Sequence, residues 1–230
     1  MKVTCVIASL AMAATATSQA VIVWNGGGDT SNFYDNANWD FSGSGETGMP
    51  ASGGNPSAAT ADDILILGAT INETSGAFTN IEIGDGLSVT LDGTSFRFTN
   101  NNGFTGVNDA GDVTSTFNIN NGSSFNAQFA AVGITVNVDS TSSIRFRGGG
   151  DPINSQIEQT TINLAPGAQL TLASVAEFTE QGADIRVGGI SFSDDPSILS
   201  LNGTTATAVP EPSSVVLMFV AGLGLIRRRR

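Results

Sequence analysis

The sequence predicts an all-β protein and favours a right-handed parallel β-helix, with a β-sandwich as the alternative. Three observations support this fold class. Short segments alternate between apolar and polar residues, which is the pattern of a strand with one buried face. Related two-strand units recur along the chain, each with a Gly-containing corner or a polar turn. No helix-length window of the body, residues 21–208, shows the 3.6-residue period of an amphipathic helix.

The first 20 residues have the features of a secretory signal peptide. Lys2 supplies a positive charge, residues 3–14 are almost entirely apolar, and Ser18 and Ala20 are small residues where signal peptidase reads the chain. We predict cleavage by signal peptidase between Ala20 and Val21. Cys5 is the only cysteine and leaves with this segment, so the mature chain has neither a disulfide nor a thiol nucleophile.

The body of the chain is strongly acidic. It holds four arginines, no lysine and no histidine against 20 acidic residues, which gives a net charge of −16. The electrostatic field of a body with this net negative charge repels nucleic acid, so we expect no nucleic-acid partner. Carboxylate and amide oxygens suit a hard cation. Calcium is therefore the one cofactor that the composition suggests, and the sequence identifies no metal-ligand residues and no other cofactor.

Residues 21–61 form a first segment that contains both tryptophans, Trp24 and Trp39. Residues 21–24 have the composition of a short strand, and residues 41–61 that of a long Gly/Ser/Pro loop. This opening resembles that of many exported bacterial β-helix proteins. We expect both tryptophans, with Phe33, to plug the open end of the core. A carbohydrate-stacking surface on Trp24 and Trp39 is the functional alternative.

Residues 62–208 form the predicted repeat domain. Related units share two alternating segments around a turn, and they occupy residues 89–98, 117–125, 136–146 and 162–172, with a weaker copy from Leu199 and a related corner at 81–87. Each unit is either two sides of a β-helix coil or a hairpin of a sandwich. Equivalent apolar residues are separated by 28, 19, 26 and 37 positions. These intervals fit coils of about 20–30 residues with loop insertions.

Little in the sequence indicates catalysis, and we predict that the protein is not an enzyme. Without histidine, the Ser-His-Asp and Cys-His arrangements and histidine zinc sites are excluded. A glycosidase needs only two carboxylates, and the candidate pairs are Asp62 with Asp63, Asp194 with Asp195, and Glu177 with Glu180. Adjacent residues of a strand point to opposite faces, so solvated loops explain these acidic pairs more simply.

Arg145 and Arg147 are the sharpest catalytic candidates, because alternate residues of a strand share one face. With Asp151 close by, a polysaccharide lyase could use an arginine base together with calcium held by aspartate. The structural alternative is that both arginines pair with acidic residues of a neighbouring strand.

Residues 209–230 consist of three parts in a fixed order. Pro210, Glu211 and Pro212 interrupt regular structure, residues 213–226 carry no charge, and Arg227, Arg228, Arg229 and Arg230 close the sequence. The uncharged run would form a helix of roughly 21 Å, against a hydrocarbon core of about 30 Å. We predict one short transmembrane helix whose arginines stay on the cytoplasmic side, with the body outside.

This tail resembles the PEP-CTERM sorting signal of exported bacterial proteins. The resemblance implies processing near Pro-Glu-Pro by an exosortase, a membrane protease, then release or attachment at the cell surface in association with exopolysaccharide. We therefore expect a surface-sorted structural or adhesive protein, transiently anchored in the cytoplasmic membrane. The alternatives are a carbohydrate-active enzyme, either lyase or hydrolase, and a calcium-dependent carbohydrate-binding module.

Overall fold

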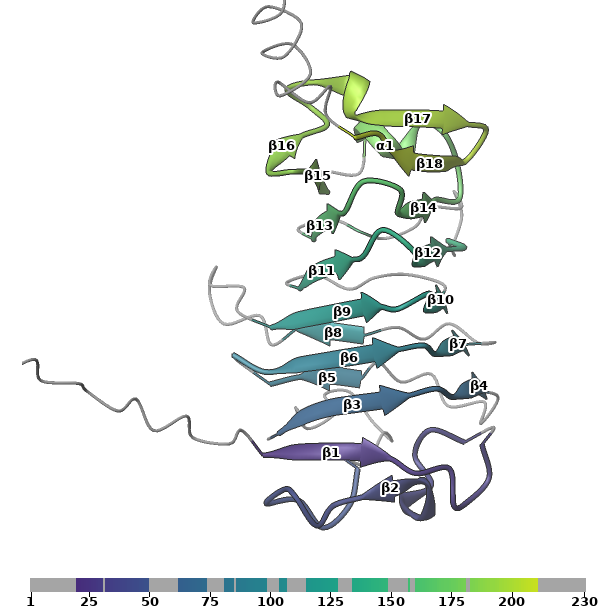
Figure 1. Ribbon diagram of the computed structural model, residues 1–230, viewed down its shortest axis with the longest axis vertical. Helices are drawn as coiled ribbons and strands as arrows, with labels where there is room; N and C mark the ends of the chain where they lie inside the picture. Colours follow the sequence, from purple (N-terminus) through teal and green to yellow (C-terminus); the bar gives the residue numbers. More distant parts are fainter. Residues whose placement is uncertain are drawn as a thin grey trace, which may run out of the picture.

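The computed structural model describes residues 20–30, 32–49, 62–73, 81–84, 86–98, 104–106, 115–127, 134–148, 157, 160–180 and 183–210. These residues form a stack of strands that runs from the β1/β2 end to the β16–β18 end (Figure 1). The predicted signal peptide, apart from Ala20, and the predicted transmembrane helix lie outside this part of the chain. Within it, no helix has the length and apolarity needed to cross a membrane.

Sheet A forms one side of the stack and has nine strands. Seven of them run parallel to one another: β1 (Val21–Trp24), β3 (Asp63–Leu67), β6 (Ser88–Asp92), β9 (Thr116–Asn120), β11 (Thr135–Val138), β13 (Thr161–Leu164) and β15 (Asp184–Val187). The outermost strands, β2 (Trp39–Asp40) and β16 (Ile190–Ser191), pair antiparallel. Both ends of sheet A are therefore closed by a strand of reversed direction.

Sheet B forms the second side and has seven strands. Five are parallel: β4 (Thr70–Glu73), β7 (Ser95–Phe98), β10 (Ser124–Ala127), β12 (Ser143–Phe146) and β14 (Gln169–Thr171). The hairpin of β17 (Leu199–Asn202) and β18 (Thr205–Ala208) then pairs antiparallel with β14. A separate pair, β5 (Ile81–Ile83) and β8 (Phe104–Gly106), is also parallel.

The order of pairing identifies a β-solenoid. Each of β3, β6, β9, β11 and β13 is followed along the chain by a strand of sheet B, and equivalent strands of successive units pair in parallel. Such stacking buries one continuous core. The all-β, β-helical prediction is confirmed and the sandwich alternative is wrong, since Gly93 and Gly122 lie at corners between the two sheets rather than in hairpin turns. The predicted right-handedness of the coil stays a prediction.

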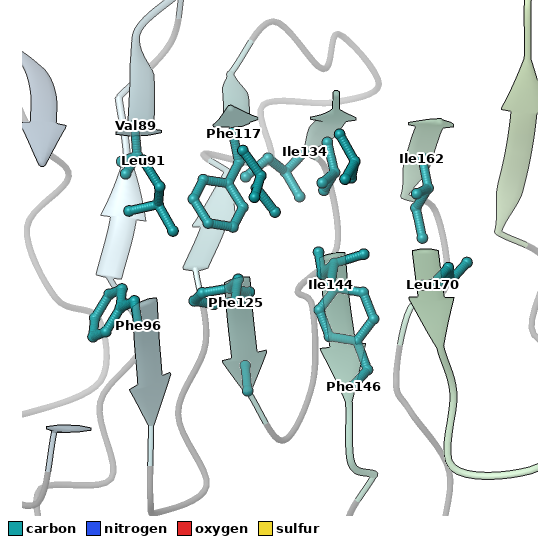
Figure 2. Packing of buried hydrophobic residues seen from close by; sticks show 14 of the residues in the cluster. Val89, Leu91, Phe96, Phe117, Phe125, Ile134, Ile144, Phe146, Ile162 and Leu170 are labelled. Carbon is teal, nitrogen blue, oxygen red and sulfur yellow. The ribbon is translucent and has the colours of Figure 1, made fainter. Parts of the chain in front are cut away.

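The core lies between sheets A and B. Buried and less buried residues alternate along the strands, as in Ser88–Asp92 and Thr116–Asn120. Val89, Leu91 and Phe117 of sheet A face Phe96, Phe125, Ile144 and Leu170 of sheet B (Figure 2). Each such side chain contributes roughly 1.5–3 kcal/mol when fully buried. The period-two pattern of the sequence thus corresponds to one face per strand inside the solenoid.

Two corrections concern the weaker repeats. The segment from Leu199 is no coil: β17 and β18 form an antiparallel hairpin around a turn that contains Gly203, and the side chain of Leu201 is 44% exposed. The coil position equivalent to Leu164 is Val187, which pairs with it in register. The segment 81–87 contributes strand β5 to the third sheet, so it is more than the predicted corner.

Short helical turns complete the fold. The 3-10 helices are Asn36–Asn38 and Pro196–Ile198, and the α-helical turn α1 is Glu177–Glu180. Both 3-10 helices begin after an aspartate, Asp35 and Asp195, whose side chain accepts a hydrogen bond from the backbone N–H two residues later. This capping fixes the loops at each end of the solenoid.

Candidate functional site

A file of amides runs along the outer face of sheet A. Asn118, Asn137 and Asn163 stand at equivalent positions of β9, β11 and β13. The Nδ2 atom of Asn163 donates to Oδ1 of Asn137, and Nδ2 of Asn137 donates to Oδ1 of Asn118, both at 2.9 Å. The parallel register stacks identical side chains, so each amide orients the next.

A second file, of hydroxyl groups, lies beside the amides. Thr116, Thr135 and Thr161 occupy one register position of the same three strands. They stand two residues before the asparagines, so they point to the same outer face. We call these six residues the Thr/Asn face. Alternation along each strand predicts a polar outer face, rich in Asn and Thr, and the pairing of distant strands in the structure shows which of these residues stack on one another.

The outer face of sheet B carries arginines instead. One register position holds Asn72, Arg97, Asn126, Arg145 and Thr171 across five neighbouring strands. Arg97 and Arg145 are exposed. Their neighbours in this file are amides and a hydroxyl, so the predicted pairing of Arg145 with acidic residues on a neighbouring strand is wrong.

Arg147 joins the same surface. Its Nη2 atom donates a hydrogen bond to the carbonyl oxygen of Phe98 on β7, two strands from β12. The guanidinium therefore crosses the end of β10 and approaches the strand that holds Arg97. Burial, followed by repulsion from the charges of Arg97 and Arg145, lowers the pKa of Arg147. We call Arg97, Arg145 and Arg147 the arginine cluster.

The structure thus unites two predicted residues with one that sequence analysis missed. Arg145 and Arg147 share a face, as expected, and the stacking of β7, β10 and β12 brings Arg97 to them. In the part of the chain that the structure describes, the only salt bridge is that of Arg186 with Asp184, at 2.5 Å. Asp151, the acidic partner in the lyase hypothesis, lies outside the described residues.

The two tryptophans lie in the core at the N-terminal end. The side chains of Trp24 and Trp39 are 7% and 4% exposed, and their rings meet edge to face with centroids 4.9 Å apart. Nε1 of Trp39 donates to the carbonyl oxygen of Phe33 at 2.7 Å, and Phe33 stacks on Phe96. Such burial supports the plug interpretation, since a sugar-stacking ring needs an exposed face.

The acidic pairs have local structural contacts. Oδ1 of Asp63 accepts hydrogen bonds from the N–H and hydroxyl of Ser88. A hydrogen bond from Ser197 lowers the pKa of Asp195, which caps the 3-10 helix. Glu177 is buried, and it begins the helical turn that ends at Glu180. Among the described residues, no three His, Cys, Asp or Glu side chains gather as metal ligands, and calcium binding stays a prediction.

A pocket of about 740 Å³ lies at the C-terminal end of the solenoid. Phe178 and Phe192 contribute apolar walls, while Asp184, Arg186 and Asp194 contribute charges. Hydrogen bonding to Arg186, opposed by burial, lowers the pKa of Asp184, with further help from Ser191 and the charge of Arg186. The two groups best suited to bind a ligand are therefore paired with each other.

The predicted cleavage point lies at the start of β1. Ala20 precedes the strand, and the backbone N–H of Val21 donates to the carbonyl oxygen of Gly43 at 3.2 Å. At the other end, Val209 donates to the carbonyl oxygen of Ile198 at 2.8 Å. Pro210 is the last described residue, so Glu211, Pro212 and the four terminal arginines lie beyond the described part.

The fold defines the class of the protein as a β-solenoid. The PEP-CTERM protein-sorting motif matches residues 208–230, beginning at the last residue of β18. The motif indicates export and exosortase-dependent sorting close to the membrane, as the sequence predicted. Comparisons with curated proteins and with solved structures give no match.

Proposed function

We propose that the protein is a structural or adhesive component of an extracellular polysaccharide matrix, which it reaches by exosortase processing. It would act by binding, without catalytic turnover. The Thr/Asn face is the observation that carries this proposal. The sorting motif supplies the route to the cell surface. There the solenoid presents a rigid array of hydrogen-bonding groups to the polysaccharide.

The chemistry of the Thr/Asn face suits sugars. A hydroxyl group both donates and accepts, and an amide offers two donors and an acceptor with two lone pairs. The bonds between Asn118, Asn137 and Asn163 use only part of this capacity. Strands repeat every 4.7–4.9 Å or so, so neutral sugar hydroxyls along a polymer meet a regular series of partners. Because the array is held by the solenoid, little side-chain entropy is lost on binding.

The sorting step can be tested by intact mass. The full-length chain is expressed in an exosortase-producing host and in an exosortase-deficient strain. The intact mass of the protein recovered from each cell fraction is then measured by mass spectrometry. We expect an extracellular or surface species that lacks residues 1–20 and the tail beyond the Pro210 region only when the exosortase is present. Recovery of Arg230 in the inner membrane of both strains would contradict sorting and would indicate a plain membrane anchor.

Matrix association needs a separate test. Thr135→Val and Thr161→Val together remove two hydroxyls from the Thr/Asn face while keeping the side-chain shape. Thr205→Val with Thr207→Val makes the same change on β18 of sheet B, away from Arg145. We expect the double variant of Thr135 and Thr161 to be retained less in the polysaccharide matrix, and the double variant on sheet B to be retained like the wild type. The length of the matrix polymer should not change in either case, since the protein is proposed not to cleave it. Equal retention by both double variants, or shortening of the polymer, would refute the proposal.

A further inference from the structure

The arginine cluster concentrates positive charge in an acidic protein. The body has four arginines against 20 acidic residues, and three of the four lie in this cluster. Within the described residues, none of the three makes a salt bridge, whereas the fourth, Arg186, pairs with Asp184. Repulsion among like charges opposes folding. An anionic partner from outside the chain would remove this cost.

We propose that Arg97, Arg145 and Arg147 form a binding site for the carboxylate groups of an acidic, uronate-containing polysaccharide. This inference rests on the proposed function and names the class of polymer. The site lies on sheet B, so it is distinct from the Thr/Asn face of sheet A.

The register of sheet B sets the spacing of the cations. Arg97 and Arg145 are two strands apart in one file, which separates their backbones by about 10 Å. Arg147 stands two residues after Arg145, about 7 Å along the strand. Its hydrogen bond to the carbonyl oxygen of Phe98 brings the guanidinium to the end of β7, the strand that also holds Arg97. The three charges therefore form a triangle across β7, β10 and β12.

Unused polar atoms lie within this triangle. Among the described residues, the buried Nε atom of Arg147 and the buried Oδ1 atom of Asn126 have no hydrogen-bond partner, and Asn126 stands between Arg97 and Arg145. A buried polar atom without a partner is costly. A carboxylate from outside the chain can accept hydrogen bonds from the exposed guanidinium groups of Arg97 and Arg145.

Carboxylates fit these donors better than other common groups of a polysaccharide. A planar guanidinium presents parallel N–H groups that match the two oxygens of a carboxylate, and such bonds are the stronger, charge-assisted kind. Separate arginines would engage successive charges of one chain, which raises the effective affinity. The body's net negative charge opposes any polyanion at long range, but exposed charges are screened beyond about 8 Å at physiological ionic strength, so the arginines dominate for carboxylates that reach the cluster.

Binding of fluorescent polygalacturonate to the full-length chain in mild detergent tests the site. Methyl-esterified polygalacturonate serves as the matched ligand, since it keeps the backbone but loses the charge. Arg145→Gln is compared with Arg186→Gln, which removes the same charge from a paired arginine. We expect the ester and Arg145→Gln each to weaken binding about tenfold or more, and Arg186→Gln to change it less than twofold.

Three results would overturn the inference. Equal binding of the acid and its ester would show that carboxylates are not recognised. Equal losses in Arg145→Gln and Arg186→Gln would show that only net charge matters. Sedimentation of the wild type as a dimer that Arg145→Gln dissociates would show that a second copy occupies the cluster.

The matrix-retention experiment keeps the two proposals distinguishable. If polygalacturonate binds through the arginines but the protein is not retained in the matrix, the matrix role fails and the carboxylate site stands. If retention depends on Thr135 and Thr161 while the acid and its ester bind alike, the carboxylate site fails alone.

Discussion

The backbone N–H of Asn121 donates a hydrogen bond to Oδ2 of Asp139 at 2.5 Å, and so connects two successive coils. Nδ2 of the same asparagine donates to Oδ1 of Asp92 at 2.8 Å, on the preceding coil. Asn121 has φ of 56°, the one positive value among described non-glycine residues. Asparagine tolerates this left-handed conformation better than most residues, so one corner residue is tied to the coils on both sides.

Asp139 should make the solenoid sensitive to acid. Although burial opposes it, hydrogen bonds from Ser142, Asn121 and Thr141 lower the pKa of Asp139 below its usual value. A lowered pKa stabilises the fold above the ordinary aspartate pKa of about 3.9, and this contribution is lost as pH falls through the lower folded-state value. We expect Tm to drop below about pH 4, and less steeply in Asp139→Asn. Identical pH profiles of Tm would contradict this.

Ser123 should be needed for stability although its side chain is small. Its hydroxyl accepts a hydrogen bond from the buried backbone N–H of Thr94 at 3.0 Å. Ser123→Ala leaves that N–H without its partner, and we expect a loss of about 1–3 kcal/mol in the free energy of unfolding, measured by urea titration. Ser124→Ala, which removes a hydroxyl from the outer face, is the control and should cost less than half as much.

Gly167 should tolerate alanine less well than Gly122. Both have positive φ, 99° and 75°. A Cβ at Gly167 would lie 2.9 Å from the carbonyl oxygen of Ser140, whereas one at Gly122 would meet no atom within 4 Å. Both variants carry backbone strain, but Gly167→Ala adds a steric clash with the neighbouring corner. We expect the lower Tm for Gly167→Ala, and the reverse order would show that the corners do not stack this closely.

Phe33 should hold the N-terminal plug on the core. Its side chain is fully buried, and its ring lies parallel to that of Phe96 at a centroid distance of 5.5 Å. Phe33→Ala should cost about 3–5 kcal/mol in the free energy of unfolding, as expected for a large buried aromatic residue. Phe41→Ala, at a partly buried site, should cost less. Unchanged denaturation of Phe33→Ala would show that this segment is no part of the folding unit.

The fold could be predicted because period-two alternation survives in every coil, but its C-terminal end could not. The interval of 37 residues to Leu201 arose from equating an exposed hairpin leucine with core positions. The true coil partner of Leu164 is Val187, 23 residues later. Asp184–Val187 alternates like the other strands, but the strand that follows it, β16, belongs to the same sheet, so the two-strand unit of the other coils is missing. Only pairing between distant strands reveals it.

Two of the three residues of the arginine cluster could be predicted, and the third could not for a related reason. Arg145 and Arg147 are two residues apart, so strand geometry alone gives them a common face. Arg97 lies 48 positions before Arg145 in the sequence, and its proximity depends on β10 lying between β7 and β12. The predicted pairing of Arg145 with acidic residues was wrong, because the register of sheet B places Asn126 and Thr171 beside it.

The reversed strands at the ends of sheet A also give the protein a fixed length. Nine strands at a spacing of about 4.8 Å span roughly 38 Å. The sorting motif begins at residue 208, beside the end that holds β17 and β18. As long as the tail keeps the chain at a membrane, the solenoid is a spacer. We then expect the aromatic plug to lie at the tip away from the membrane, several screening lengths from the lipid headgroups.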